Sequence, residues 1–159
     1  MSAQPPAPAT RGSGHPTARR RVACYVVRET GDGRELLVFD HVGVPEAGTQ
    51  VPAGGIEHAE SVEEAAVREV AEECGVSGAP VVRLLGVSLR PHVETGAPQH
   101  TSYVLMRYDG RGDRREEPWT WQAGGAGVDE GMLFRCWFTA LPLDGVELAG
   151  HQEEFLGEV

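Results

Sequence analysis

The segment GGIEHAESVEEAAVREVAEECGV, residues 54–76, predicts a glycine turn followed by one amphipathic helix. Ser61 and Glu64 have the spacing of a capping box, which marks the start of a helix. Gly75 stands where a left-handed residue would end it. Between them, apolar residues recur at every fourth position and form a stripe suited to packing on a core: Val62, Ala66, Val70 and Cys74.

Three glutamates of this helix, Glu69, Glu72 and Glu73, are expected on one side of it, because positions three and four apart are neighbours. Like charges on an exposed helix cost only about 0.2–0.5 kcal/mol per pair, so the cluster alone is weak evidence for a metal site and is more typical of a solvated face. Gly54 and Gly55, however, let backbone carbonyls approach a ligand closely. Carboxylates and carbonyls together are the ligands that Mg²⁺ prefers, so a divalent-metal site is predicted.

The sequence around this helix predicts mainly strands. Their β-branched and aromatic runs cover Arg21–Val27, Glu35–His41, Pro80–Arg90, His100–Tyr108 and Met132–Leu141, with a short strand around Gln50–Pro52. The end of the chain, residues 148–159, predicts a second, short helix. Several strands with one strong and one weaker helix indicate an α+β fold, a sandwich in which helices pack on a mixed sheet.

Length and composition indicate one domain, residues 20–159, after a disordered Pro/Ala/Gly-rich tail, residues 1–19. Arg19, Arg20 and Arg21 are interpreted as part of a solvated basic tail rather than as phosphate ligands. The formal net charge of −10 repels phosphate backbones, so nucleic-acid binding is not expected. No run of 18 apolar residues is present, so no membrane span is expected.

Two further features of composition restrict the chemistry. All 14 basic residues are arginine, which excludes a Walker-type phosphate lysine and a Schiff base. The three cysteines, Cys24, Cys74 and Cys136, are odd in number and widely spaced. This pattern argues against a disulfide scaffold or a zinc site and favours a reducing cytoplasm.

The segment from Gly54 to Val76 resembles the signature of the Nudix hydrolases, G-x5-E-x7-R-E-U-x-E-E-x-G-U, where U is a bulky aliphatic residue. Every fixed position is filled, by Gly54, Glu60, Arg68, Glu69, Val70, Glu72, Glu73, Gly75 and Val76. A chance match has a probability of roughly a few in a million, so the resemblance is specific. It extends over about residues 20–157 and implies a Nudix-like α/β/α sandwich with a mixed β-sheet.

The resemblance implies a hydrolase that cleaves the diphosphate linkage of a nucleoside diphosphate derivative with the help of Mg²⁺ or Mn²⁺. It assigns metal binding to the side chains of Glu69, Glu72 and Glu73 and to the carbonyl of Ala53. It assigns catalysis to two of these glutamates and to the pair that orients them: Glu69, Glu73, Arg68 and Glu60. The alternative is a non-catalytic nucleotide-binding or sensing module on the same fold.

Substrate and general base stay open at this point. Pro91 resembles a mark of ADP-ribose-type members, so ADP-ribose or a nucleotide sugar is slightly favoured over a nucleoside triphosphate. Arg90 and His92 beside it are candidate substrate contacts, as is Glu130. The base is Glu69 or a distant acid: Glu130, Glu153 or Glu154. Trp119 and Trp121 are candidates for stacking on a base, and many members of the family pair as homodimers.

Overall fold

The computed structural model of the protein describes residues 17–110, 116–127 and 129–159. Most of the predicted tail, residues 1–16, lies outside the described residues. Its last residue, Arg19, already begins the first strand. The arginines at 19–21 are therefore part of the sheet, and their interpretation as a solvated tail was wrong.

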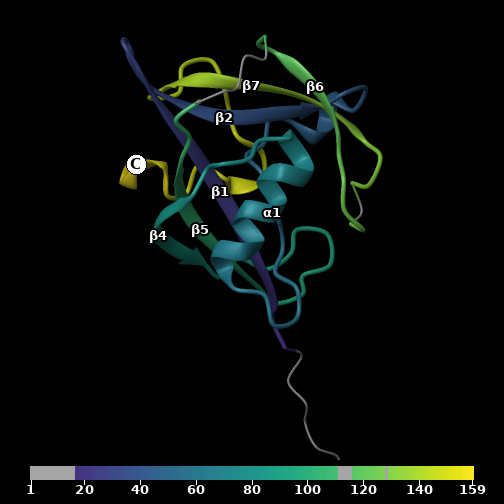
Figure 1. Ribbon diagram of the computed structural model, residues 1–159. Coiled ribbons are helices and arrows are strands. Elements are labelled where there is room, and N and C mark those ends of the chain that lie inside the picture. Colours follow the sequence, from purple (N-terminus) through teal and green to yellow (C-terminus); the bar gives the residue numbers. More distant parts are fainter. Residues whose placement is uncertain (1–16, 111–115, 128) are drawn as a thin grey trace, which may run out of the picture.

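Seven strands of the described residues form one mixed, open sheet in the order β4-β5-β1-β2-β7-β6, with β3 paired to β1 (Figure 1). Strand β1 runs parallel to β5, and the other pairs are antiparallel, which confirms the predicted mixed sheet. The strands are β1 Arg19–Thr30, β2 Gly33–His41, β3 Ala53–Gly55, β4 Val81–Ser88, β5 Gln99–Arg107, β6 Trp119–Gln122 and β7 Leu133–Leu141.

Strand β1 organises the sheet because it is long enough to have different partners along its length. One edge of β1 pairs with β5 from Arg19 to Val27. The other edge pairs with β2 only near its end, at Val27 to Thr30. Near its start, the same edge pairs with β3, where Val22 lies opposite Gly54. The glycine turn is thus held beside the first residues of β1.

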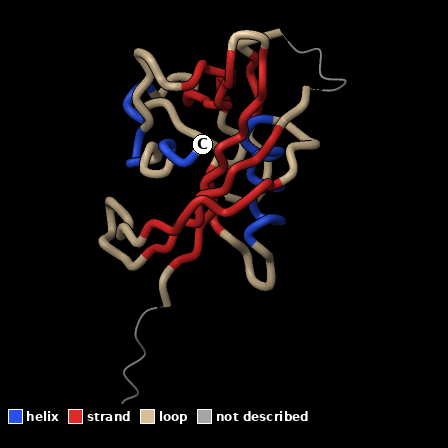
Figure 2. Tube along the Cα trace, turned by 90° about the vertical axis from the view of Figure 1, so that its left-hand side faces the viewer, coloured by secondary structure: helices blue, strands red, loops and turns tan. Residues whose placement is uncertain are grey.

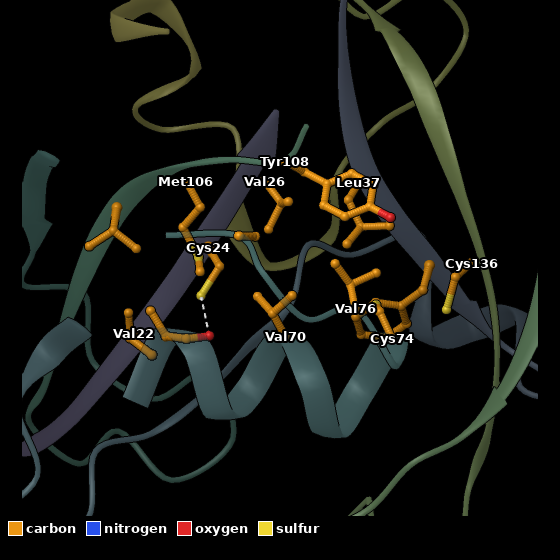
Figure 3. Close-up of a cluster of buried hydrophobic side chains, with 14 of the residues drawn as sticks. Val22, Cys24, Val26, Leu37, Val70, Cys74, Val76, Met106, Tyr108 and Cys136 are labelled. Carbon is orange, nitrogen blue, oxygen red and sulfur yellow. Dashed lines mark hydrogen bonds between the residues drawn. The ribbon is translucent and has the colours of Figure 1, made fainter. Parts of the chain in front are cut away.

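The predicted helix is confirmed as α1, Val62–Cys74, with Ser61 and Glu64 forming both bonds of the capping box. Gly75 ends it in the left-handed region, at φ 65° and ψ 21°. The apolar stripe packs on β1, where the Cys24 thiol donates a hydrogen bond to the Ala66 carbonyl at 3.8 Å (Figure 3). Alternate residues of β1 thus complete the core beneath α1: Val22, Cys24 and Val26.

Replacing Ser61 by alanine is expected to lower the free energy of unfolding by about 1 kcal/mol, because its hydroxyl accepts from the Glu64 amide at 3.1 Å. Chemical denaturation measures the change. Ser77→Ala is the matched control, since Ser77 is exposed just after the helix. Equal losses in the two variants would show that the cap contributes nothing.

The opposite face of the sheet is covered by the end of the chain, which lies on the side away from α1 (Figure 2). The Tyr25 hydroxyl there donates to the Gln152 carbonyl and accepts from the Phe155 amide at 3.3 Å. The predicted second helix consists instead of two short 3-10 helices, η2 Ala149–His151 and η3 Leu156–Glu158. Gly150 adopts a φ of 64°, which a continuous α-helix does not allow.

Other differences concern short segments. The tryptophan-rich segment 119–122 is not among the predicted strands, yet it forms β6. The strand predicted around Gln50–Pro52 is displaced to β3, and Gln50 makes only an isolated bridge to Phe39. A 3-10 helix, η1 Pro45–Ala47, precedes it. None of the helices in the described ranges is long and apolar enough to cross a membrane.

Candidate active site

A cleft of about 280 Å³ is bordered by α1, β3, the start of β1 and the loop after β6. Six carboxylates and three guanidinium groups are among its lining residues. The lining residues are Arg19, Arg21, Ala53, Gly54, Gly55, Ile56, Glu57, Arg68, Glu69, Glu72, Glu73, Ala123, Gly124, Ala126, Gly127, Asp129 and Glu130.

Two of the helix glutamates are buried in this cleft, with Glu69 8% and Glu73 6% exposed. Glu73 Oε2 accepts a hydrogen bond from the Ala53 amide at 2.9 Å. Burial raises the pKa of Glu69, and it raises the pKa of Glu73 well above its usual range. A solvated helix face would leave both carboxyls in water, so their burial argues against that alternative.

Arg68 connects the helix glutamates to the loop before the helix. Its Nε and Nη2 donate to the two Glu60 oxygens at 2.7 and 2.9 Å, and Nη2 also donates to the Gly55 carbonyl at 2.8 Å. Its Nη1 donates to Glu69 at 2.8 Å and to Glu72 at 3.3 Å. The bonds from Arg68 lower the pKa of Glu60 to about 2. The planar guanidinium thus fixes the positions of three carboxylates.

Arg68→Lys is expected to lower the free energy of unfolding by about 1–3 kcal/mol, because an ammonium cannot make the paired bonds to Glu60 and also reach Gly55. Arg90→Lys is the control. Arg90 is 57% exposed and makes one ion pair, to Glu154 at 3.0 Å, so about 0.5 kcal/mol or less is expected. Similar losses at both positions, measured by denaturation, would contradict the special role of Arg68.

The glycine turn fits closely against the helix. A Cβ at Gly54 would lie 2.0 Å from the Glu69 carboxyl, so no larger residue leaves Glu69 in place. The Ala53 carbonyl, immediately before it, has the Arg21 Nη2 3.5 Å away. The carbonyl and the glutamates are therefore brought to the same wall of the cleft.

The end of α1 is tied to β6 and the loop that follows it. The indole Nε1 of Trp121 and the amide of Gly124 both donate to the Glu72 carbonyl, at 3.0 and 2.9 Å. Trp119 Nε1 donates to the Cys74 carbonyl at 2.9 Å. These bonds satisfy carbonyls that a helix end leaves without partners. Neither tryptophan lines the cleft, so base stacking by them is not supported by this arrangement.

A family model described as "NUDIX domain" matches residues 17–152. The chain belongs to the Nudix hydrolase family. The prediction of enzyme class is thereby confirmed, since members are pyrophosphohydrolases that act on nucleoside diphosphate derivatives. No curated protein matches the sequence significantly.

Solved structures show the same fold at low identity. The NUDIX domain of Shewanella oneidensis NrtR, solved with ADP ribose, has a TM-score of 0.63 and 14% identity over 89% of this chain and 85% of that one. A UDP-X diphosphatase has a TM-score of 0.60 and 18% identity, and the match covers 93% of this chain and 64% of that one. A MutT/nudix family protein from Enterococcus faecalis has a TM-score of 0.50 and 22% identity, and the match spans only 38% of its length and 58% of this chain.

The donor set of this Nudix site fits a hard divalent cation, because carboxylates and a backbone carbonyl share one wall. The described side chains do not already form a group of three or more acidic, histidine or cysteine residues at metal-binding distances. The Arg68 guanidinium instead bonds to Glu69 and Glu72. Metal binding would therefore require small movements of these two carboxylates. The space beside Gly54 is filled by the Glu69 carboxyl, which lies where a Cβ at position 54 would be.

The candidate acids from distant segments separate into two groups. Glu130 lines the cleft, together with Asp129, whose Oδ1 lies 3.8 Å from His41 Nε2. Glu153 and Glu154, near the end of the chain, do not line it. Glu154 forms an ion pair with Arg90 instead. The general base stays a prediction, and of its candidates Glu69 and Glu130 line the cleft.

The two predicted substrate contacts near Pro91 lie outside the cleft. Arg90 points to Glu154, and the His92 Nδ1 accepts from the Thr95 amide at 3.3 Å within the β4–β5 loop. Neither is among the lining residues of the cleft. Their role in substrate binding stays a prediction.

Sequence reasoning missed Arg19, Arg21 and Asp129 as residues of the cleft. Burial lowers the pKa of Arg21, with the charge of Arg19 as the next cause. The apolar run from Val22 onward was a signal for β1, but the three arginines before it do not indicate that the strand begins at Arg19. No comparable local signal marks Asp129.

Proposed function

We propose that the protein is a divalent-metal-dependent hydrolase that cleaves the diphosphate linkage of a nucleoside diphosphate derivative. The observation that carries the proposal is the shared wall of the cleft. There the Ala53–Gly54 turn meets Glu69, Glu72 and Glu73 of α1, and Arg68 bonds to two of these glutamates. Such a constellation suits phosphoanhydride hydrolysis, because a diphosphate is a poor electrophile until its charge is offset.

The residues that would hold Mg²⁺ or Mn²⁺ are Glu69, Glu72, Glu73 and the Ala53 carbonyl. The bound ion would offset phosphate charge and lower the pKa of a water ligand. The paired hydrogen bonds between Arg68 and Glu60 fix the guanidinium, which in turn holds the glutamate side chains in position. Ala53 also holds Glu73 in place through its amide.

Removal of the proton from the attacking water falls to Glu69 or to an acid of the loop after β6. Glu130 is the loop candidate from the sequence, and Asp129 beside it is favoured by its position near Glu73 and His41. A base must come within about 2.6–3.2 Å of the attacking water, so a loop acid would complete its approach in the substrate complex.

The substrates proposed are ADP-ribose, a nucleotide sugar or a nucleoside triphosphate. Proteins of the same fold support the first two, since one was solved with ADP ribose and another is a UDP-X diphosphatase. We also propose a cytoplasmic location, supported by three buried cysteines without disulfides, and pairing as a homodimer. No nucleic-acid partner is proposed.

A substrate panel tests the function directly. Product release is measured from ADP-ribose, nucleoside triphosphates, nucleotide sugars and dinucleoside polyphosphates, with Mg²⁺, with Mn²⁺ and with chelator. Hydrolysis of at least one substrate is expected only with metal. Calorimetry showing tight nucleotide binding without turnover under saturating Mg²⁺ would favour the sensing module, and neither binding nor turnover would contradict both functions.

A further inference from the structure

Two arginines of β1 line the cleft without a carboxylate partner. In the described ranges, no acidic oxygen lies within ion-pair distance, 4.0 Å, of Arg19 or Arg21. The Arg21 Nε is buried and has no hydrogen-bond partner, and its Nη2 is only at 3.5 Å from the Ala53 carbonyl. Arg68, the third arginine of the cleft, is by contrast fully engaged by Glu60, Glu69 and Gly55.

The strand register explains why these two side chains reach the same place. Residues two apart point to the same side of a strand, so Arg19 and Arg21 follow one another along β1. Arg21 lies opposite Gly55 in the β1–β3 pair. A Cβ at Gly55 would lie 3.6 Å from the Arg19 Nη2, so the guanidinium lies over the turn. Arg21 is therefore placed beside the Ala53 carbonyl, the predicted metal ligand, and Arg19 beside Gly55 of the same turn.

An unpaired, partly buried guanidinium is unfavourable by itself, because it loses water without gaining a hydrogen-bond acceptor. Placing it beside a metal-binding wall is doubly unfavourable, since a bound cation repels it. An anion between the two positive charges removes both costs. Guanidinium groups are also the side chains best matched to phosphate oxygens.

We propose that Arg21 and Arg19 form a phosphate-binding subsite on the β1 side of the cleft. This inference rests on the proposed function, and the ligand is a phosphate group of the diphosphate substrate. Arg68 and these two arginines then have different tasks. Arg68 holds glutamates, whereas Arg21 and Arg19 bind substrate, with Arg21 contributing more because it is less exposed.

The test measures binding of methylenediphosphonate, a non-hydrolysable diphosphate, by calorimetry in saturating Mg²⁺. Arg21→Gln is expected to weaken it at least about tenfold, the size of one lost charge-assisted hydrogen bond, and Arg19→Gln about threefold. Arg21→Lys is expected to recover part of the loss. Arg107→Gln, at the exposed far end of β5, is the control and should leave affinity unchanged.

A second measurement, the dissociation constant of Mn²⁺, distinguishes phosphate binding by Arg21 from a purely structural role in which Arg21 only positions Ala53. Binding of Mn²⁺ is expected to be retained or strengthened in Arg21→Gln, because removing the guanidinium charge removes a repulsion of the cation. Loss of Mn²⁺ affinity as large as the loss of diphosphonate affinity would show that Arg21 only braces Ala53, and would overturn the subsite.

The remaining outcomes are equally decisive. Unchanged diphosphonate affinity in both glutamine variants, with Mn²⁺ binding retained, overturns the subsite alone. Absence of saturable Mn²⁺ binding in the unaltered protein overturns the proposed function, and the subsite with it. Thermal melting checks that Arg21→Gln folds, and the exposed Arg19→Gln variant carries the test if it does not.

Discussion

In the Glu73→Gln variant, kcat/KM on the substrate that is cleaved best is expected to fall about 10³-fold. The reason is that the amide keeps the shape of the side chain but removes a negative oxygen from the metal-binding wall. A catalytic metal contributes several kcal/mol to transition-state stabilisation, and each 1.36 kcal/mol is a factor of ten in rate. Initial rates at several Mg²⁺ concentrations measure the loss and show how much of it excess metal restores.

The same substitution is expected to leave the fold intact or to stabilise it. Burial raises the pKa of Glu73, so the ionised carboxyl costs stability at any pH above the ordinary pKa of a glutamate. The amide carries no charge, and its oxygen can still accept from the Ala53 amide. Thermal melting in chelator should therefore give a midpoint equal to or above that of the unaltered protein.

Glu63→Gln is the matched control, because Glu63 lies exposed in the first turn of the same helix. It should retain activity within about twofold, since surface substitutions of this kind change little. Equal activity of Glu73→Gln and the unaltered enzyme would show that Glu73 is not part of the metal site. A collapse of stability in Glu73→Gln would show that its role is structural.

The helix and its box could be predicted because their determinants are local. The bonds between Ser61 and Glu64, the four-residue apolar stripe and the left-handed Gly75 all lie within one short segment. Burial of Glu69 and Glu73 could not be predicted in the same way. It depends on β3 lying over the helix. The position of β3 is set by its pairing with β1, which is distant from it in the sequence.

The remaining walls of the cleft depend on contacts between distant segments. Trp121 reaches the Glu72 carbonyl only because β6 pairs with β7 at the edge of the sheet. Arg21 enters the cleft only because β1 starts at Arg19 and pairs with Gly55. Three consecutive arginines carry no period of their own, so the sequence did not separate a strand from a basic tail.

Gly54→Ala is expected to weaken Mn²⁺ binding and to lower kcat/KM by about 10²-fold, with little loss of stability. The added methyl would lie 2.0 Å from the Glu69 carboxyl carbon, and Gly54 itself is fixed by pairing with Val22. The flexible glutamate must therefore move away. Displacing a reactive group by about 1 Å costs about this factor in rate, whereas the fold loses only the bond of Arg68 to Glu69.

Gly55→Ala supplies the matched control for this prediction. The two glycines are neighbours in β3, and neither adopts a positive φ, so backbone freedom does not distinguish them. A Cβ at Gly55 would meet nothing closer than the Arg19 Nη2 at 3.6 Å, an ordinary contact. Metal titration and initial rates should therefore separate the two variants widely. Equal losses would mean that the turn needs flexibility in general, and that contact with Glu69 is not what requires glycine at position 54.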